Sequence, residues 1–156
     1  MPEYIHVTKE EEYAASASLF KEYAQGLDID LGFQKFTEEL TQLKEMYGPP
    51  QGGIILAKTG IDFVGCIAIR KIKGEPGIAE LKRMYVKPLN QQHGIGSGLL
   101  AEALLLAKRL AYKKIRLDTL SNMTPAIGLY KRNGFYEIPA YYHNPEETAV
   151  YFEKIL

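Results

Sequence analysis

A glycine-rich stretch, QQHGIGSGLL at residues 91–100, contains the residue types that could bind an anionic ligand. Glycines let backbone N–H groups approach a ligand without interference from Cβ atoms, and the stretch leads into an apolar segment that is expected to be helical. The N-terminus of a helix carries a partial positive charge that favours phosphate groups. The pattern therefore predicts a phosphate-binding loop, with a turn that only reverses the chain as the alternative.

Two common nucleotide-binding patterns do not fit this loop. A dinucleotide-binding fold requires G-x-G-x-x-G, but Leu99 occupies the third glycine position. A P-loop requires Gly-Lys-Ser or Gly-Lys-Thr, and neither follows here. The sequence therefore disfavours a nicotinamide-dependent oxidoreductase and a P-loop nucleotidase.

Three linked motifs match a different pattern. Q-x-x-G-x-G lies at residues 91–96, ELKRMYV at 80–86 is followed by Pro88, and AIGLYKRNGF lies at 126–135. With these motifs, over about residues 78–138, the sequence resembles the GCN5-related N-acetyltransferase (GNAT) superfamily. The resemblance implies transfer of an acetyl group from acetyl-CoA, as co-substrate, to an amine by direct attack in a ternary complex.

The resemblance also implies how acetyl-CoA is held. The glycine loop would wrap its pyrophosphate, with backbone N–H groups of the loop as donors, and the main chain of the strand before it would pair with the pantetheine arm. The Met84 N–H would donate to the thioester oxygen. The implied cofactor-binding residues are Met84, Val86, Gln91, Gln92, His93, Gly94, Ile95, Gly96, Ser97 and Asn122.

Some of these positions carry alternatives. Gln91 stands where the family has Gln or Arg, and His93 either contacts a phosphate or is solvated. Met123 stands where many members have an asparagine that contacts the cofactor. Asn122 is adjacent and is expected to replace that contact.

Acetyl transfer to an amine also needs a proton for the departing thiolate. Tyr130 falls on the tyrosine of the family's L-Y pair. A phenol with a reference pKa of about 10 stays protonated at neutral pH and can supply that proton. The alternative is a helix tyrosine that is packed in the core.

Glu80 is the candidate general base. It lies eleven residues before Gln91, the spacing at which the histone-acetylating branch of the family places its glutamate, and it shares a strand face with Lys82 and Met84. A carboxylate there could accept the amine proton. The competing interpretation is an ion pair with Lys82 or Arg83, which stabilises little if exposed.

The resemblance implies an amine acceptor, either a small molecule or an amine of a peptide or protein. Tyr141, Tyr142 and His143 could line its pocket together with Phe33 and Gln34, although aromatic residues in a late loop also serve in packing. The alternative function is a non-catalytic acyl-CoA-binding regulatory module that keeps the phosphate loop without turnover. A homodimer is compatible with either function.

Composition disfavours several classes of partner. The 156 residues include 19 basic and 19 acidic side chains, so we expect neither nucleic acid nor an anionic membrane as the main partner. The N-terminal segment is acidic, unlike a signal peptide, and the apolar segment 99–110 is too short to cross a bilayer. These features favour a cytoplasmic protein without a membrane anchor.

The cysteine and the histidines indicate neither a disulfide nor a metal site. Cys66 is the only cysteine, so no internal disulfide can form. It lies in the apolar run FVGCIAI, which predicts a buried residue rather than a nucleophile. His6, His93 and His143 are scattered without ligand spacing, so no metal site is expected.

Hydrophobic periodicity predicts the elements that position these residues. Thr8 is expected to cap the first helix, with Glu11 completing a capping box, and residues 33–47 are expected to form one continuous helix. The expected helices are 8–26, 33–47, 96–112 and 125–132, and the expected strands are 4–7, 53–58, 63–70, 78–86, 114–120, 135–138 and 148–154. They predict one N-acetyltransferase domain over residues 1–156 of α+β class. Its mixed, mostly antiparallel sheet would lie in three α/β/α layers, the GNAT or acyl-CoA N-acyltransferase fold.

Overall fold

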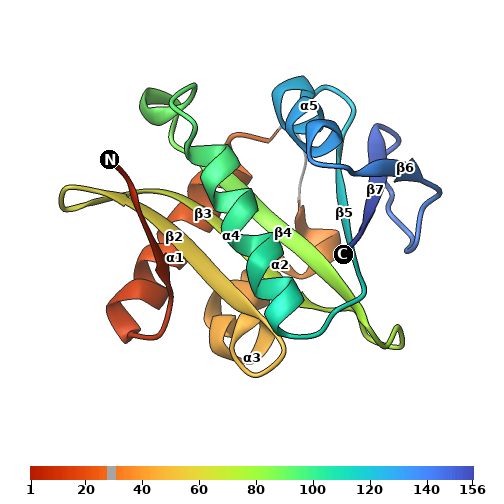
Figure 1. Ribbon diagram of the computed structural model, residues 1–156, viewed down its shortest axis with the longest axis horizontal. Coiled ribbons are helices and arrows are strands. Elements are labelled where there is room, and N and C mark those ends of the chain that lie inside the picture. Colours follow the sequence, from red (N-terminus) through yellow and green to blue (C-terminus); the bar gives the residue numbers. More distant parts are fainter. Residues whose placement is uncertain (28–30) are drawn as a thin grey trace.

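Seven strands in the described part of the chain form one mixed sheet in the order β1-β2-β3-β4-β5-β7-β6 (Figure 1). The computed structural model describes residues 1–27 and 31–156, without the side chains of Phe33 and Gln34. The strands are β1 (Glu3–His6), β2 (Gly53–Thr59), β3 (Asp62–Lys71), β4 (Ile78–Val86), β5 (Lys114–Leu120), β6 (Tyr136–Ile138) and β7 (Ala149–Ile155). All neighbouring strands are antiparallel except β4 and β5, which are parallel. The predicted mixed, mostly antiparallel sheet is confirmed.

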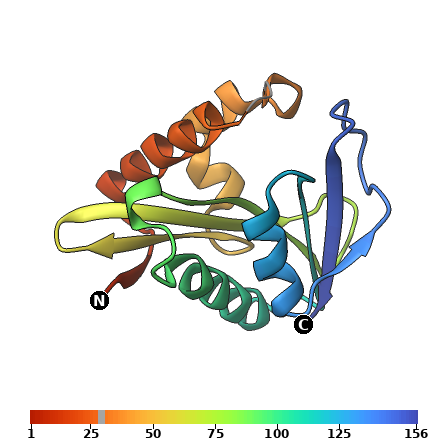
Figure 2. The same cartoon turned by 90° about the horizontal axis from the view of Figure 1, so that it is seen from above.

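Helices cover both faces of this sheet (Figure 2). One face carries the N-terminal helices, and the other carries α4 and α5, which confirms the three-layer α+β architecture. The helices are α1 (Glu10–Gln25), α2 (Phe36–Thr41), α3 (Leu43–Tyr47), α4 (Ile95–Arg109) and α5 (Thr124–Arg132), with short 3₁₀ turns η1 (Leu31–Gln34) and η2 (Pro88–Asn90).

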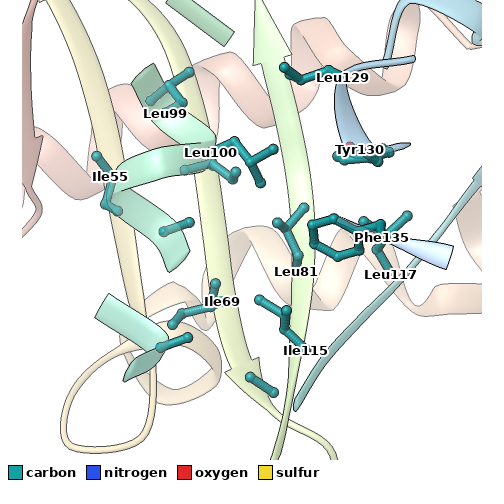
Figure 3. Close-up of a cluster of buried hydrophobic side chains, with 14 of the residues drawn as sticks. Ile55, Ile69, Leu81, Leu99, Leu100, Ile115, Leu117, Leu129, Tyr130 and Phe135 are labelled. Atoms are coloured by element: carbon teal, nitrogen blue, oxygen red, sulfur yellow. The ribbon is translucent and has the colours of Figure 1, made fainter. Parts of the chain in front are cut away.

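Two hydrophobic clusters, one on each face, hold the layers together. Successive strand residues point to opposite faces, so in β2 Ile55 packs beneath α4 while Leu56 packs against the N-terminal helices. The first cluster also contains Leu99 and Leu100 of α4 together with Tyr130 of α5 (Figure 3). Cys66 belongs to the second cluster and is fully buried, as predicted, and burial raises the pKa of its thiol.

The start of α1 differs by one residue from the prediction that Thr8 and Glu11 form the cap. Lys9 is the capping residue, and the Glu12 carboxylate accepts hydrogen bonds from the N–H groups of Thr8 (2.9 Å) and Lys9 (3.0 Å). These two hydrogen bonds lower the pKa of Glu12. The capping carboxylate therefore lies three residues after Lys9 rather than after Thr8, since the helix begins at Glu10.

The predicted continuous helix over residues 33–47 is wrong. The chain is broken at Lys35, whose φ is 56°, and again at Gln42, whose φ is −131°, so η1, α2 and α3 are separate. The apolar spacing of Phe36, Leu40 and Leu43 persists across the second break, because each of the short helices still turns its apolar side toward the sheet. Helical spacing of apolar residues therefore does not reveal a helix break at a single residue.

The strand β4 contains a bulge at Arg83. Opposite it, Cys66 of β3 pairs with Tyr85 and Ala68 pairs with Lys82, so that two β4 residues face one β3 residue. Arg83 has a φ of 60°, in the left-handed region that is uncommon for residues other than glycine. The parallel pairing of β4 with β5 covers only residues 78–80, after which the two strands separate.

A buried ion pair holds this bulge from the face covered by the N-terminal helices. The Arg83 guanidinium donates from Nε to Glu39 Oε2 (2.9 Å) and from Nη2 to Glu39 Oε1 (2.8 Å). The two side chains are 3% and 1% exposed, and the rings of Phe36 and Tyr23 lie 5.1 and 5.9 Å from the guanidinium. Burial by itself would lower the pKa of Arg83, but the hydrogen bonds and charge of Glu39 raise it overall. The pair joins α2 to the irregular residue of β4.

Removing the Glu39 charge should destabilise the protein. We expect Glu39→Gln to lower the free energy of unfolding by about 3 kcal/mol, because it leaves a buried guanidinium without a counter-charge. Chemical denaturation measures this loss. Glu38→Gln, on the exposed side of the same helix, is the control and should change stability by less than about 0.5 kcal/mol. Equal stability of the two variants would contradict the structural importance of the pair.

Candidate active site

A cavity lies where β4 and β5 separate. Met123, Ala126 and Tyr130 line it from α5 and the turn before it, Tyr23 lines it from α1, and Leu27 lines it from just past the end of α1. The cavity is also lined by polar or charged residues from both strands and from the loop before β7. They are Lys82, Arg83, Asp118, Thr119 and Asn144. Apolar and charged residues therefore share the wall of the cavity.

Tyr130, the candidate proton donor, is in the cavity wall. Its ring is 5% exposed and packs against Phe135, with ring centroids 5.6 Å apart (Figure 3). Its hydroxyl group lies 4.0 Å from the Met84 sulfur atom, which places a phenolic O–H beside β4. Burial raises the pKa of Tyr130, so the phenol is protonated at neutral pH and can act as a proton donor.

The glycine loop leads directly into α4. Gly94 has a φ of 80° and precedes the first helical residue, Ile95, and Gln92 also has a positive φ of 66°. Within the described part of the chain, none of the N–H groups from Gln92 to Ser97 donates to another main-chain group. A Cβ added at Gly94 would meet no atom within 4 Å. The loop thus presents a series of exposed N–H groups at a helix N-terminus, the arrangement that binds phosphate.

The other loop residues have different roles. The Gln91 side chain donates from Nε2 to the Val86 carbonyl oxygen (2.9 Å) and so ties the loop to the end of β4. His93 is exposed, with Nδ1 3.3 Å from the Asn90 carbonyl oxygen. The side chain of Ile95 is buried in the cluster beneath α4, so only its main chain can face a ligand.

Asn122 and Met123 lie at the position where many members of the family have a cofactor-binding asparagine. Asn122 is exposed in the turn before α5, whereas Met123 lines the cavity. The Thr119 hydroxyl lies 3.6 Å from the Met123 sulfur atom. The thioether of Met123 therefore forms this part of the wall, and Asn122 is not among the lining residues described.

Glu80 is buried in an ion pair and is not among the residues that line the cavity. It accepts from Arg70 Nε at Oε1 (2.9 Å) and from the Tyr141 hydroxyl at Oε2 (2.7 Å). Burial would raise the pKa of Glu80, but the charges of Lys82 and Arg70 and these hydrogen bonds lower it overall. Glu80 is therefore in an ion pair, but its partner is Arg70 rather than the expected Lys82 or Arg83, because Arg83 pairs with Glu39.

Asp118 is the carboxylate that faces the cavity, and the motifs did not indicate it. The Tyr142 hydroxyl donates to Asp118 Oδ2 (2.8 Å), and Asn144 Nδ2 donates to the same hydroxyl (3.2 Å). In β5 the buried Ile115 and Leu117 alternate with polar residues, so period-two alternation could have placed Asp118 on the face opposite Leu117.

Lys82 is the cavity cation. Its side chain is 6% exposed, and Nζ lies 3.9 Å from Asp118 Oδ1. Burial lowers the pKa of Lys82, and the carboxylates of Glu80 and Asp118 oppose this shift. Two ion pairs, Arg70 with Glu80 and Lys82 with Asp118, are therefore present at the site.

The aromatic residues before β7 support both carboxylates. The rings of Tyr141, Tyr142 and Tyr151 pack edge to face with centroids 5.4–5.8 Å apart. Tyr141 and Tyr142 therefore reach the site through their hydroxyl groups, whereas His143 is exposed. The side chains of Phe33 and Gln34 lie outside the described residues.

In residues 1–27 and 31–156, no three His, Cys, Asp or Glu side chains are grouped as metal ligands. None of the described helices has the length and apolar character needed to cross a bilayer.

Comparisons with known proteins agree with this architecture. The model of the acetyltransferase (GNAT) family matches residues 9–135. An uncharacterized N-acetyltransferase of Schizosaccharomyces pombe is 38% identical over 134 residues, which cover 85% of this chain and 82% of the relative. An acetyltransferase structure from Streptococcus agalactiae aligns with a TM-score of 0.80 at 22% identity, covering 99% of this chain and 98% of its own. The PaiA N-acetyltransferase of Thermoplasma acidophilum, solved in complex with coenzyme A, aligns with a TM-score of 0.73 at 19% identity, covering 100% and 99%.

Proposed function

The chain belongs to the acetyltransferase (GNAT) family, and on that premise we propose that it transfers an acetyl group from acetyl-CoA to an amine by direct attack in a ternary complex. Family membership supports acyl transfer from an acyl-CoA. The observation that carries the proposal is the cavity between β4 and β5, whose wall includes a protonated phenol, Tyr130, and a carboxylate, Asp118.

The glycine loop and β4 would bind the co-substrate. The N–H groups from Gln92 to Ser97 lie at or just before the N-terminus of α4 and have no main-chain acceptor among the described residues, which suits a pyrophosphate. Beyond residue 80, β4 does not pair with β5, so its main chain at Met84 and Val86 can bond an extended pantetheine arm. Acetyl-CoA supplies the activated acyl group as a thioester.

The residues of the chain would then move two protons. A carboxylate accepts the proton of the acceptor amine, the Met84 N–H polarises the thioester carbonyl, and the Tyr130 hydroxyl protonates the thiolate. The nitrogen–carbon bond forms as the carbon–sulfur bond breaks, with the electron pair leaving on sulfur. We propose Asp118 as the base in the cavity, and the earlier expectation for Glu80 stays a prediction.

A non-catalytic acyl-CoA-binding module remains the rival function. Calorimetry with acetyl-CoA, set beside thiol release over a panel of amines, separates the two. Binding together with thiol release supports the enzyme, whereas tight binding with no release on any acceptor supports the module. Because Cys66 is buried, it should not consume the thiol reagent in this assay.

Replacing Gly94 should weaken coenzyme A binding. Gly94→Ala forces a side chain into a φ of 80°, so the loop either stores strain or changes conformation, and we expect an increase of about tenfold in Kd. Titration calorimetry measures this change. Gly74→Ala is a matched control, because Gly74 has a φ of 82° and equally open surroundings in the loop before β4. A similar loss of affinity in both variants would contradict the role of the loop.

Tyr130→Phe should lower kcat by about 100-fold while leaving the Kd for acetyl-CoA unchanged, because it removes only the proton donor. Steady-state thiol release and calorimetry measure the two quantities. Tyr112→Phe is the control, since the Tyr112 hydroxyl bonds the Gln51 carbonyl and is not among the cavity-lining residues. Unchanged turnover in Tyr130→Phe would remove Tyr130 from the mechanism.

The two carboxylates can be separated by substitution. We expect Asp118→Asn to lower kcat/KM by about 100-fold, because it removes the proposed base. Glu80→Gln should lower it by less than about tenfold, since Glu80 is held by Arg70 and Tyr141 and is not among the described residues that line the cavity. The reverse result would assign the base to Glu80.

A further inference from the structure

Gly98, in the first turn of α4, lies directly beneath a side chain of β1. A Cβ atom added at Gly98 would lie 1.8 Å from Tyr4 Oη, 2.2 Å from Cζ and 2.9 Å from Cε2. These distances are far below van der Waals contact, so no larger residue fits at position 98 while Tyr4 keeps its place. The Tyr4 phenol therefore occupies the space that a side chain at position 98 would need.

Helix propensity does not favour a glycine at position 98. The Gly98 N–H donates to the Gly94 carbonyl oxygen (3.1 Å) and so closes the first turn of α4. In such a helical conformation alanine is more favourable than glycine by about 1 kcal/mol. The close approach of Tyr4, rather than the backbone conformation, is what requires a glycine here.

The strand β1 contacts α4 at a second point, one helical turn further on. His6 Nε2 lies 3.3 Å from Glu102 Oε2. Tyr4 and His6 are two residues apart and share a strand face, while Gly98 and Glu102 are four residues apart and share a helix face. Burial, and then the charge of Glu102, raise the pKa of Tyr4, in keeping with this arrangement. β1 therefore lies along the first two turns of α4 (Figure 1).

The helix α5 contacts the same turn from another side. A Cβ atom added at Gly96 would lie 3.7 Å from Leu129 Cδ2, which is an ordinary van der Waals distance. Positions 96 and 98 are about 200° apart around the helix axis, because an α-helix has 3.6 residues per turn. Tyr4 and Leu129 therefore hold the first turn of α4 between them, from β1 and from α5.

Packing decides the position of this turn because a side-chain cap is lacking. The capping residue of α4 is Gly94, which has no side chain to accept a hydrogen bond from the N–H groups of the first turn. Those N–H groups belong to the proposed pyrophosphate donors. Hydrogen bonds weaken steeply as their distances and angles depart from the optimum, so a small displacement of the turn would reduce affinity.

On the basis of the proposed coenzyme A site, we propose that Tyr4 is a positioning residue for the co-substrate. Its ring, packed over Gly98, holds the first turn of α4 where the N–H groups can converge on the pyrophosphate of acetyl-CoA. The ring supplies this contact, and the hydroxyl group is not needed for it. Without the ring the turn has no contact on its β1 side, and with a side chain at position 98 the ring and the turn are pushed apart.

Tyr4→Ala tests the role of the ring. We expect the Kd for acetyl-CoA, measured by titration calorimetry, to rise by about tenfold. The kcat at saturating acetyl-CoA should change by less than about twofold, because the side chains of the cavity wall stay in place. Tyr4→Phe keeps the ring and should hold the Kd within about twofold of that of the unmodified protein. An equal loss of affinity in Tyr4→Phe would overturn the proposal, since it would assign the effect to the hydroxyl group.

Tyr112→Ala is the matched control for lost packing. Tyr112, like Tyr4, is partly buried against the first hydrophobic cluster, but it lies past the C-terminal end of α4. Both alanine variants should lower the melting temperature, whereas Tyr112→Ala should leave the Kd for acetyl-CoA within about twofold. A similar rise in Kd in both variants would overturn the proposal, because affinity would then follow stability alone.

Gly98→Ala tests the contact from the helix side, and it decides the proposal even if Tyr4→Ala fails to fold. Alanine favours the helix, so this variant should remain folded. We expect its Kd for acetyl-CoA to rise by about tenfold, and the double variant with Tyr4→Ala to stay within about threefold of either single variant. An unchanged Kd in Gly98→Ala, or effects that multiply in the double variant, would contradict a shared contact.

These outcomes are distinct from a failure of the proposed function. If the unmodified protein did not bind acetyl-CoA in the same titration, the proposed coenzyme A site would be wrong, and the inference with it. Binding by the unmodified protein, with the same Kd in Tyr4→Ala and in Gly98→Ala, would overturn the inference alone.

Discussion

The bidentate ion pair between Arg83 and Glu39 is the interaction on which the site depends. Arg83 is the left-handed residue of the β4 bulge, and it is buried together with its partner under the N-terminal helices. A regular β4 would continue to pair with β5, and the hydrogen bonds of that ladder would occupy the space of the cavity. The two hydrogen bonds between Arg83 and Glu39 offset the free-energy cost of burying both charges, and they hold the bulge at which β4 lies apart from β5.

The two faces of the sheet contribute different parts of the site. On one face, α4 brings the glycine loop to the end of β4, and α5 brings Tyr130 beside Met84. On the other face, α1 supplies Tyr23, which contacts both the cavity and the Arg83 guanidinium. Because β4 lies between these layers, its bulge lies near the glycine loop, Tyr130 and the part of the cavity lined by Tyr23.

Electrostatic balance explains why so many charges can be buried here. Arg70 with Glu80 and Lys82 with Asp118 neutralise each other, and the hydroxyl groups of Tyr141 and Tyr142 satisfy the remaining carboxylate oxygens. A half-satisfied network would be less stable than an apolar core.

Local patterns in the chain were enough to locate β4, β5, the glycine loop and Tyr130, because strand alternation, glycine positions and helix ends depend on neighbouring residues. They could not reveal the break at Gln42, since apolar spacing survives one irregular residue. Nor could they pair Arg83 with Glu39, 44 residues away, or show that Glu80 bonds Arg70 while Asp118 faces the cavity. Such partners depend on how layers pack in three dimensions, and side-chain distances across those layers are not encoded in any short stretch of sequence.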